Sequence, residues 1–187
     1  MEGFQESKFI LVSGLPLAGK STLCTYLERT YGFIHIALGE LIRENVTYKQ
    51  TIEEHIKSGQ LIPSKISFDI LQRELIKNHG KIILIDGFPR NEENLSLWNQ
   101  HIGIQPFCVL LLEVEVDVIM ARLSDRKHEN RLDDNDILLK SRINSFYKET
   151  MPVLEYYKQN NLLYSVNNKR DDIISDVIRV LDVIKLI

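Results

Sequence analysis

The sequence contains few of the features that mark secreted, membrane-bound or nucleic-acid-binding proteins. Its two cysteines, Cys24 and Cys108, make neither a metal-ligand quartet nor a disulfide framework. We expect both to be small buried side chains in a reducing compartment. The net charge of −3 at pH 7 is not the basic excess that is typical of a general nucleic-acid binder. The composition therefore argues against secretion and against a nucleic-acid partner.

Long apolar runs are also absent from the chain. The longest one, residues 107–112, is far shorter than the roughly 20 residues that span a bilayer. The N-terminus, residues 1–8, is polar and lacks the apolar segment of a signal peptide. We therefore expect no membrane contact and a cytoplasmic location, with entry into the nucleus left open.

Apolar runs alternate with amphipathic segments from one end of the chain to the other. Short, continuous apolar runs predict buried strands, and segments with one apolar face predict helices. Strands are predicted over residues 9–12, 34–36, 82–85, 107–114 and 162–166, and helices over 21–30, 40–44, 48–57, 64–77, 91–100, 116–124, 134–159 and 171–186.

This alternation predicts an α/β protein with a five-stranded parallel sheet. Continuous apolar strands are covered on both faces, and each parallel pair needs a crossover, which the intervening helices supply. No repeat and no Pro- or Gly-rich linker divides the 187 residues, so a single domain, 1–187, is expected. Two candidate inserts interrupt the pattern, at residues 38–68 and around 126–134.

The strongest motif is a phosphate-binding loop, or P-loop, at residues 14–21. It reads GLPLAGKS, matches G-x-x-x-x-G-K-[ST], and lies between a predicted strand and a predicted helix. Its backbone N–H groups and the N-terminus of the helix favour phosphate oxygens. Lys20 is expected to reach the β- and γ-phosphates, and Ser21 to help hold Mg²⁺. The chain is thus predicted to bind a nucleoside triphosphate.

A P-loop alone does not distinguish a switch from an enzyme. Residues 168–171 read NKRD, which fits the N-K-x-D guanine signature of GTPases. None of the nine glycines, however, has an aspartate three residues before it, as the γ-phosphate switch of a GTPase requires. We therefore interpret NKRD as a chance string in a polar loop that can still contact a nucleotide base.

Charged residues after the third predicted strand indicate phosphoryl transfer. Asp86 ends that strand, where a carboxylate is suited to hold Mg²⁺ directly or through water. Gly87 and Pro89 are expected to fix a turn that holds Arg90 near the P-loop. Phosphoryl transfer needs positive groups around the phosphate. The sequence alone does not establish that the further arginines converge there; these are Arg122 and Arg126, four apart on one helix, with Arg131 and Arg142.

Several strings together resemble a known family. Besides the P-loop they are GELIR at 39–43, GQLIP at 59–63, DGFPRNEEN at 86–94 and RLDDN at 131–135. In this order and spacing they are similar to nucleoside monophosphate kinases, most closely to UMP-CMP kinases and their adenylate kinase relatives. The resemblance implies the P-loop kinase fold, with an acceptor-binding insert at about 38–68 and a short lid at about 126–134. It also implies a monomer.

The activity implied by the resemblance is transfer of the γ-phosphoryl group of ATP to a nucleoside monophosphate, CMP or UMP in the first place, with Mg²⁺ as cofactor. Asn94 would read the acceptor base, and Arg122 would stack on the base of ATP. The implied catalytic residues are Lys20, Arg90, Arg126, Arg131 and Arg142. The implied ATP site comprises Leu15, Pro16, Leu17, Ala18, Gly19, Lys20, Ser21, Thr22, Arg122, Arg126 and Lys169. The implied acceptor site comprises Leu38, Arg43, Gln60, Leu61, Ile62, Pro63, Gly87, Arg90, Asn94, Arg131 and Arg142.

The chain departs from the family pattern at three positions. Leu17 and Ser21 stand where family P-loops usually have glycine, so we expect Leu17 either to strain the loop or to rest against the core. Leu38 stands where adenylate kinases usually have Thr and UMP-CMP kinases Ala, which leaves the acceptor open. Two alternatives therefore remain: an adenylate kinase or relative with altered acceptor choice, and a P-loop switch or regulatory module.

Overall fold

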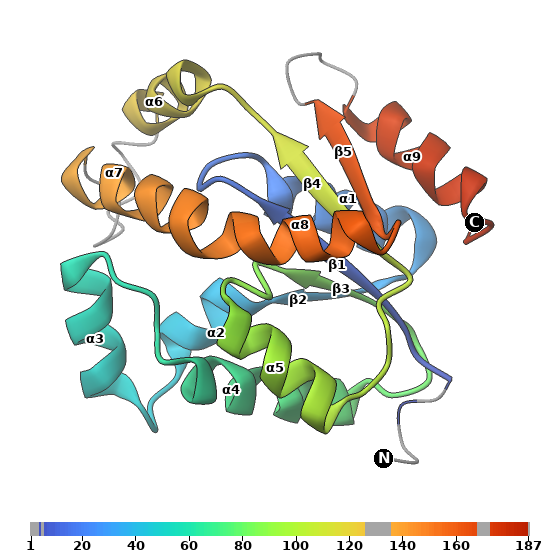
Figure 1. Ribbon diagram of the computed structural model, residues 1–187, viewed down its shortest axis with the longest axis horizontal. Helices are drawn as coiled ribbons and strands as arrows, with labels where there is room; N and C mark the ends of the chain where they lie inside the picture. The colour runs from blue at the N-terminus through green and yellow to red at the C-terminus, as the bar shows by residue number, and fades with distance from the viewer. Residues whose placement is uncertain (1–3, 5, 126–135, 168–172, 187) are drawn as a thin grey trace.

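The structure is a computed structural model, and it describes residues 4, 6–125, 136–167 and 173–186 (Figure 1). Within these ranges, no helix combines the length and the apolar character needed to cross a membrane.

A five-stranded sheet with every neighbouring pair parallel forms the centre of the molecule, as the sequence predicts. The strand order is β2-β3-β1-β4-β5, so β1 lies in the middle. The register pairs Asp86 of β3 with Val12 of β1 and Ala37 of β2. The carboxyl ends of these three strands therefore meet at one edge of the sheet. The strands are β1 (Lys8–Gly14), β2 (Ile34–Ala37), β3 (Ile82–Asp86), β4 (Cys108–Glu113) and β5 (Leu163–Asn167).

Successive strand residues point to opposite sides of the sheet, and on these strands both sides are apolar. Helices therefore cover both faces. On β1, Phe9 and Leu11 belong to one core cluster, and Ile10 and Val12 to the other. The first cluster packs against α2 (Leu38–Glu44), α3 (Lys49–Ser58), α4 (Ser64–Lys77), α5 (Glu92–His101) and α8 (Met151–Gln159), the last of which crosses the near face in Figure 1. The second packs against α1 (Lys20–Tyr31), α6 (Val116–Asp125), α7 (Asp136–Ser145) and α9 (Ile173–Val183).

The prediction of one regular α-helix over residues 134–159 is wrong, because a π-helix interrupts it. Within the described residues, α7 and α8 are joined by a π-helix, η1 (Phe146–Thr150). The N–H of Met151 donates to the carbonyl of Phe146, five residues earlier, and Pro152 has no N–H to donate. Apolar periodicity does not reveal such a one-residue widening, because the flanking turns keep their helical pattern.

Candidate active site

The P-loop begins where β1 ends, in the centre of the carboxyl edge of the sheet. Gly14 has φ 147°, and a Cβ there would lie 2.7 Å from the carbonyl oxygen of Leu112. Only glycine therefore lets β1 turn so close to β4. Lys20 opens α1, and its Nζ donates to the carbonyls of Gly14 (3.0 Å) and Leu15 (2.9 Å). These hydrogen bonds hold the Lys20 side chain over the P-loop. Lys20 is expected to bind the phosphates there.

Leu17 shows both of the consequences expected of a leucine at its position. Its φ of 62° lies in the left-handed region, which costs an L-residue about 1–2 kcal/mol. Its side chain packs against the second core cluster, and its carbonyl accepts a 2.9 Å hydrogen bond from Nη1 of Arg122. Apolar packing and this hydrogen bond hold the loop in the conformation that glycine would adopt without strain.

Asp86 and Ser21 form an oxygen-rich pair beside the P-loop. The hydroxyl of Ser21 donates to Oδ2 of Asp86 at 2.6 Å, and Asp86 is 7% exposed. Burial by itself would raise the pKa of Asp86, but the His35 ring, the Lys20 ammonium and the Ser21 hydroxyl together hold it below its usual value. An ionised carboxylate next to a hydroxyl is the hard donor set that suits Mg²⁺. The residues present therefore fit a magnesium ion.

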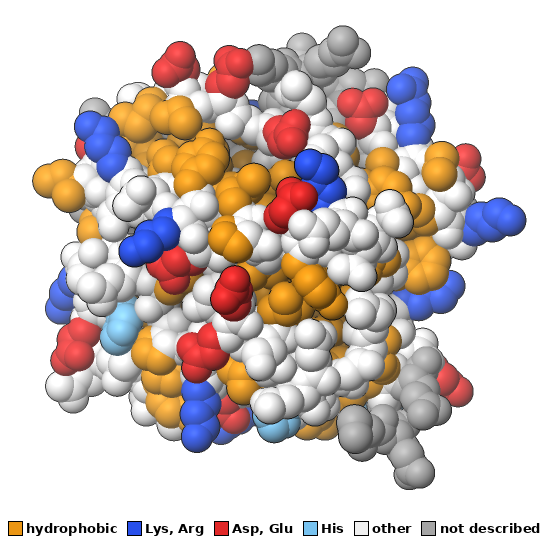
Figure 2. Space-filling model, in the orientation of Figure 1, with side chains coloured by type: hydrophobic (Ala, Val, Ile, Leu, Met, Phe, Trp, Pro, Cys, Tyr) orange, Lys and Arg blue, Asp and Glu red, His pale blue; other side chains and the backbone are white. Residues whose placement is uncertain are grey.

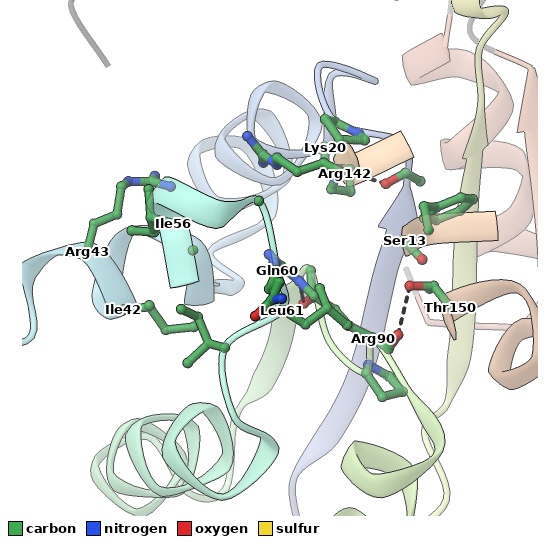
Figure 3. A pocket seen from close by; sticks show the side chains of 18 residues that line it. Ser13, Lys20, Ile42, Arg43, Ile56, Gln60, Leu61, Arg90, Arg142 and Thr150 are labelled. Atoms are coloured by element: carbon green, nitrogen blue, oxygen red, sulfur yellow. Dashed lines mark hydrogen bonds between the residues drawn. The ribbon is translucent and has the colours of Figure 1, made fainter. Parts of the chain in front are cut away.

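Arg90 is fixed from several sides. Its Nε donates to the carbonyl of Gly87 at 2.8 Å, and its backbone N–H donates to Oδ1 of Asn94 at 3.1 Å. The hydroxyl of Thr150, in η1, donates to the carbonyl of Arg90 at 2.8 Å, as Figure 3 shows. A Cβ on Gly87 would lie 2.9 Å from Nη2 of Arg90. The turn after β3 therefore holds this guanidinium near the P-loop, as the sequence predicts.

Within the part of the chain that the structure describes, three adjoining hollows include Arg90 in their lining. The first, here called the P-loop cleft, has a volume of about 990 Å³ and runs along residues 16–23. The second, the inner pocket, has about 120 Å³ and lies between the P-loop, α2, the segment after α3, and η1 (Figure 3). A side pocket of about 10 Å³ adjoins the inner pocket. Arg90 lines all of them, and the cations shared by the P-loop cleft and the inner pocket are Lys20, Arg43, Arg90 and Arg142.

Most of the site residues predicted from the sequence line these hollows. In the P-loop cleft are Pro16, Leu17, Ala18, Gly19, Lys20, Ser21, Thr22, Asp86 and Arg122. In the inner pocket are Arg43, Gln60, Leu61, Ile62, Gly87, Arg90 and Arg142, and in the side pocket Leu38 and Asn94. Leu15 is buried behind the loop, and Pro63 caps α4 without lining any of these hollows. Arg126, Arg131, Lys169 and the strings at 131–135 and 168–171 lie outside the described residues.

Sequence reasoning missed several residues that line the site. Phe146 and Thr150 reach the inner pocket from η1, and Ile173 and Ile174 reach the P-loop cleft from the start of α9. None of them belongs to a motif. Thr150 is polar but only 4% exposed in the structure, and no local sequence pattern indicates that burial.

The cations Lys20, Arg43, Arg90 and Arg142 line these hollows. On the face shown in Figure 2, Lys and Arg side chains are interspersed with Asp and Glu. A patch of one sign, as a nucleic-acid backbone would need, is not seen on that face.

Triphosphate affinity is expected to depend on pH through Lys20. Burial, the largest cause, lowers the pKa of Lys20 to about 8, with Arg90 and Arg142 acting in the same direction and Asp86 against them. A phosphate ligand binds the protonated lysine, so above pH 8 binding must take up a proton and affinity falls, by at most about tenfold per pH unit. Titration of the protein with ATP between pH 7 and 9.5 measures this. A Lys20→Met control should bind weakly without this dependence, and a flat profile in the parent protein would contradict the prediction.

Comparison with known proteins adds an independent observation. The family model for adenylate kinase matches residues 12–162. The chain is 32% identical to UMP-CMP kinase 2 of Caenorhabditis elegans, over 92% of this chain and 95% of that protein. It is 33% identical to UMP-CMP kinase of Prunus armeniaca, over 83% and 69%, and 30% identical to UMP-CMP kinase of Sus scrofa, over 94% and 97%.

Proposed function

Because the chain belongs to the adenylate kinase family and is a nucleoside monophosphate kinase, we propose that it phosphorylates a pyrimidine nucleotide, CMP or UMP, with ATP as the phosphoryl donor. The relatives reported above carry the names of UMP-CMP kinases, and they support this choice of acceptor.

The observation that carries the proposal is the set of cations shared by two adjoining hollows. Lys20, Arg43, Arg90 and Arg142 line both the P-loop cleft and the inner pocket. ATP in the cleft and a monophosphate in the pocket would therefore direct their phosphates at the same group of charges. A switch protein that only holds or hydrolyses a triphosphate has no need of the inner pocket.

Catalysis in this arrangement depends on position and charge. The transferred phosphoryl group passes through a transition state with charge spread over its oxygens, so the side chains have no covalent chemistry to perform. Lys20 and the P-loop backbone hold the donor, while Arg43 and Arg90 hold the acceptor phosphate. Arg90 and Arg142 stabilise the charge that develops between the two. Ser21 and Asp86 would hold a magnesium ion, which would supply positive charge against the phosphates of ATP.

Two segments of the chain, residues 38–68 and 126–134, have proposed roles in addition to that of the P-loop. We assign acceptor binding to residues 38–68, and a short lid that excludes water to residues 126–134, with Arg126 and Arg131 contributing further charge. We also assign Lys169 and Arg122 to binding of the donor base, and Ile173 and Ile174 line the P-loop cleft. The protein is proposed to act as a monomer.

The side pocket is the feature that bears on acceptor choice. Leu38 is 1% exposed and presents only apolar atoms, so it offers no hydroxyl to an adenine base. Asn94 and Ser67 are the polar side chains of this pocket besides Arg90. Oδ1 of Asn94 is engaged by the backbone of Arg90, and Nδ2 lies 3.5 Å from Oγ of Ser67. The amide nitrogen is thus the part of Asn94 that remains for a base.

A panel of acceptors tests the proposed function. Purified protein, ATP and Mg²⁺ are incubated in parallel with CMP, UMP, dCMP, AMP or GMP, and diphosphate formation is followed. Faster turnover of CMP or UMP than of AMP and GMP is expected. Turnover of AMP alone would contradict the pyrimidine assignment and indicate an adenylate kinase.

Replacing Asn94 with alanine is expected to change acceptor preference as well as rate. Loss of Oδ1 frees the N–H of Arg90 and lowers turnover of every acceptor. Loss of Nδ2 removes a base contact worth about 0.5–1.5 kcal/mol, which corresponds to a change of roughly two- to tenfold in the ratio of kcat/KM between CMP and UMP. Kinetics with both acceptors measure the ratio.

Asn91→Ala is the matched control for this variant. The Asn91 side chain caps α5 and accepts the N–H of Asn94 at 2.8 Å, but it lies outside the lining of the side pocket. It should lower stability by about 1 kcal/mol and leave the acceptor ratio unchanged. A uniform fall for both acceptors in Asn94→Ala would restrict Asn94 to positioning Arg90.

A further inference from the structure

A second group of potential metal ligands shares Asp86 with the magnesium pair, and its other two members, Cys24 and His35, have no role in the kinase reaction. Among the described residues, Sγ of Cys24, Nε2 of His35 and a carboxylate oxygen of Asp86 all lie within 4.8 Å of one another. The three side chains come from α1, β2 and the end of β3. They are brought together by the fold, since the sequence places them far apart.

His35 is the member that points to a ligand. Its side chain is 9% exposed, and its Nε2 is a buried polar atom without a hydrogen-bond partner. Nε2 lies 3.8 Å from Oδ2 of Asp86, which is too long for a hydrogen bond. Nε2 therefore has an electrostatic contact with Asp86 but no hydrogen bond, which costs free energy in a buried polar group and calls for a specific explanation.

From this geometry we infer that Cys24, His35 and Asp86 form a binding site for Zn²⁺ that overlaps the magnesium pair at Asp86. Thiolate, imidazole and carboxylate are the donors that zinc takes, whereas Mg²⁺ takes oxygen donors and leaves sulfur and imidazole unused. The inference goes beyond the proposed kinase reaction.

The spacing of the donors is close to that of a zinc site. Zinc bond lengths of 2.0–2.3 Å in tetrahedral geometry place neighbouring ligand atoms about 3.3–3.6 Å apart. The 3.8 Å between Nε2 of His35 and Oδ2 of Asp86 is close to this distance, and the remaining pairs, which lie within 4.8 Å, need at most about 1.5 Å of side-chain adjustment. Three protein ligands leave the fourth position to water, as in open zinc sites. Asp86 lines the P-loop cleft, which supplies the path of entry.

The electrostatic setting limits the affinity of this site. Burial, helped by the nearby Asp86, holds the pKa of Cys24 well above its usual value, so the group is a thiol and zinc binding releases its proton. The Lys20 ammonium is close enough to Asp86 to affect it, and it opposes a dication. An ion bound here takes Asp86 from Ser21, so zinc and the magnesium pair compete for one carboxylate. Zinc occupancy would therefore inhibit the enzyme.

Zinc titration of the nucleotide-free protein tests the inference. The full chain, stripped with a chelator, is titrated with Zn²⁺ alone against a chromophoric chelator. One bound equivalent per chain is expected, and Cys24→Ala and His35→Asn should each weaken its binding by about tenfold or more. Cys108→Ala is the matched control, because Cys108 is equally buried in β4 and stands outside the cluster. It should bind zinc as the parent does.

Cobalt gives a second readout that identifies the sulfur ligand. Co²⁺ in place of Zn²⁺ should give a thiolate charge-transfer absorption in the parent and in Cys108→Ala, and none in Cys24→Ala. Should Cys24→Ala fail to fold, as circular dichroism would show, His35→Asn carries the comparison. Absence of the bound equivalent in the parent, or its retention in His35→Asn, would overturn the inference. No nucleotide is present, so the result is independent of the proposed activity.

Discussion

Replacing Arg90 with alanine is expected to lower kcat for phosphoryl transfer about 10³-fold while leaving the affinity for ATP nearly unchanged. Arg90 lines the P-loop cleft, the inner pocket and the side pocket, so it faces both proposed substrates. Its guanidinium is held by Gly87 and its backbone by Asn94 and Thr150. An arginine fixed in this way needs no reorganisation as charge develops, which is the condition for a large effect.

Two variants sharpen the test of Arg90. Arg90→Lys keeps the charge but not the planar fork of donors, and it should recover little of the rate. Arg122→Ala is the matched control, since Arg122 lines the P-loop cleft and stands outside the lining of the inner pocket. It should raise the KM for ATP and leave acceptor kinetics nearly intact. Normal turnover by Arg90→Ala, measured in a coupled assay, would remove Arg90 from the catalytic residues.

Asp86→Asn is expected to lower kcat/KM by about 10²-fold and to raise the Mg²⁺ concentration needed for half-maximal activity. The substitution keeps the shape of the side chain, and it removes the negative charge that faces Lys20 and accepts the Ser21 hydroxyl. A neutral amide is a poorer ligand for a hard dication, so more Mg²⁺ is needed to fill the site. Activity measured across a magnesium series gives both quantities.

The control for Asp86→Asn is a carboxylate away from the site. Asp69, on α4, accepts hydrogen bonds from Tyr48 and Arg73 and lines none of the hollows of the site. Asp69→Asn should leave the magnesium dependence unchanged. If Asp86→Asn folds, as its thermal transition would show, and keeps the magnesium dependence of the parent, then Asp86 is not part of the metal site.

The fold and the donor side of the site could be predicted because their signals are local. The strands are short apolar runs, and the P-loop is one continuous string whose backbone supplies most of its chemistry. Asp86 was identifiable for the same reason, since the end of β3 places it at the carboxyl edge of the sheet. The backbone strain and core packing of Leu17 also followed from the sequence, because a leucine at a position that usually holds glycine must strain the loop or pack against the core.

The rest depended on long-range contacts that no local pattern carries. Thr150 contacts the carbonyl of Arg90, 60 residues away in the sequence. Thr150 belongs to the π-helix η1, which α-helical periodicity does not reveal. The placement of Arg43 and Arg142 beside Lys20 required the whole chain to fold first. The grouping of Cys24 and His35 with Asp86 is of the same kind, because each residue alone looks like an ordinary core side chain.

The fate of the γ-phosphoryl group tests the central claim most directly, namely that one group of cations joins a donor site to an acceptor site. The protein is mixed with Mg²⁺, ATP labelled at the γ-phosphate, and CMP or UMP, and labelled products are separated over time. We expect the label to appear in CDP or UDP, with little inorganic phosphate, because the cations deliver the group to the acceptor. Label released only as inorganic phosphate, with CMP, UMP and AMP each present in turn, would contradict that claim.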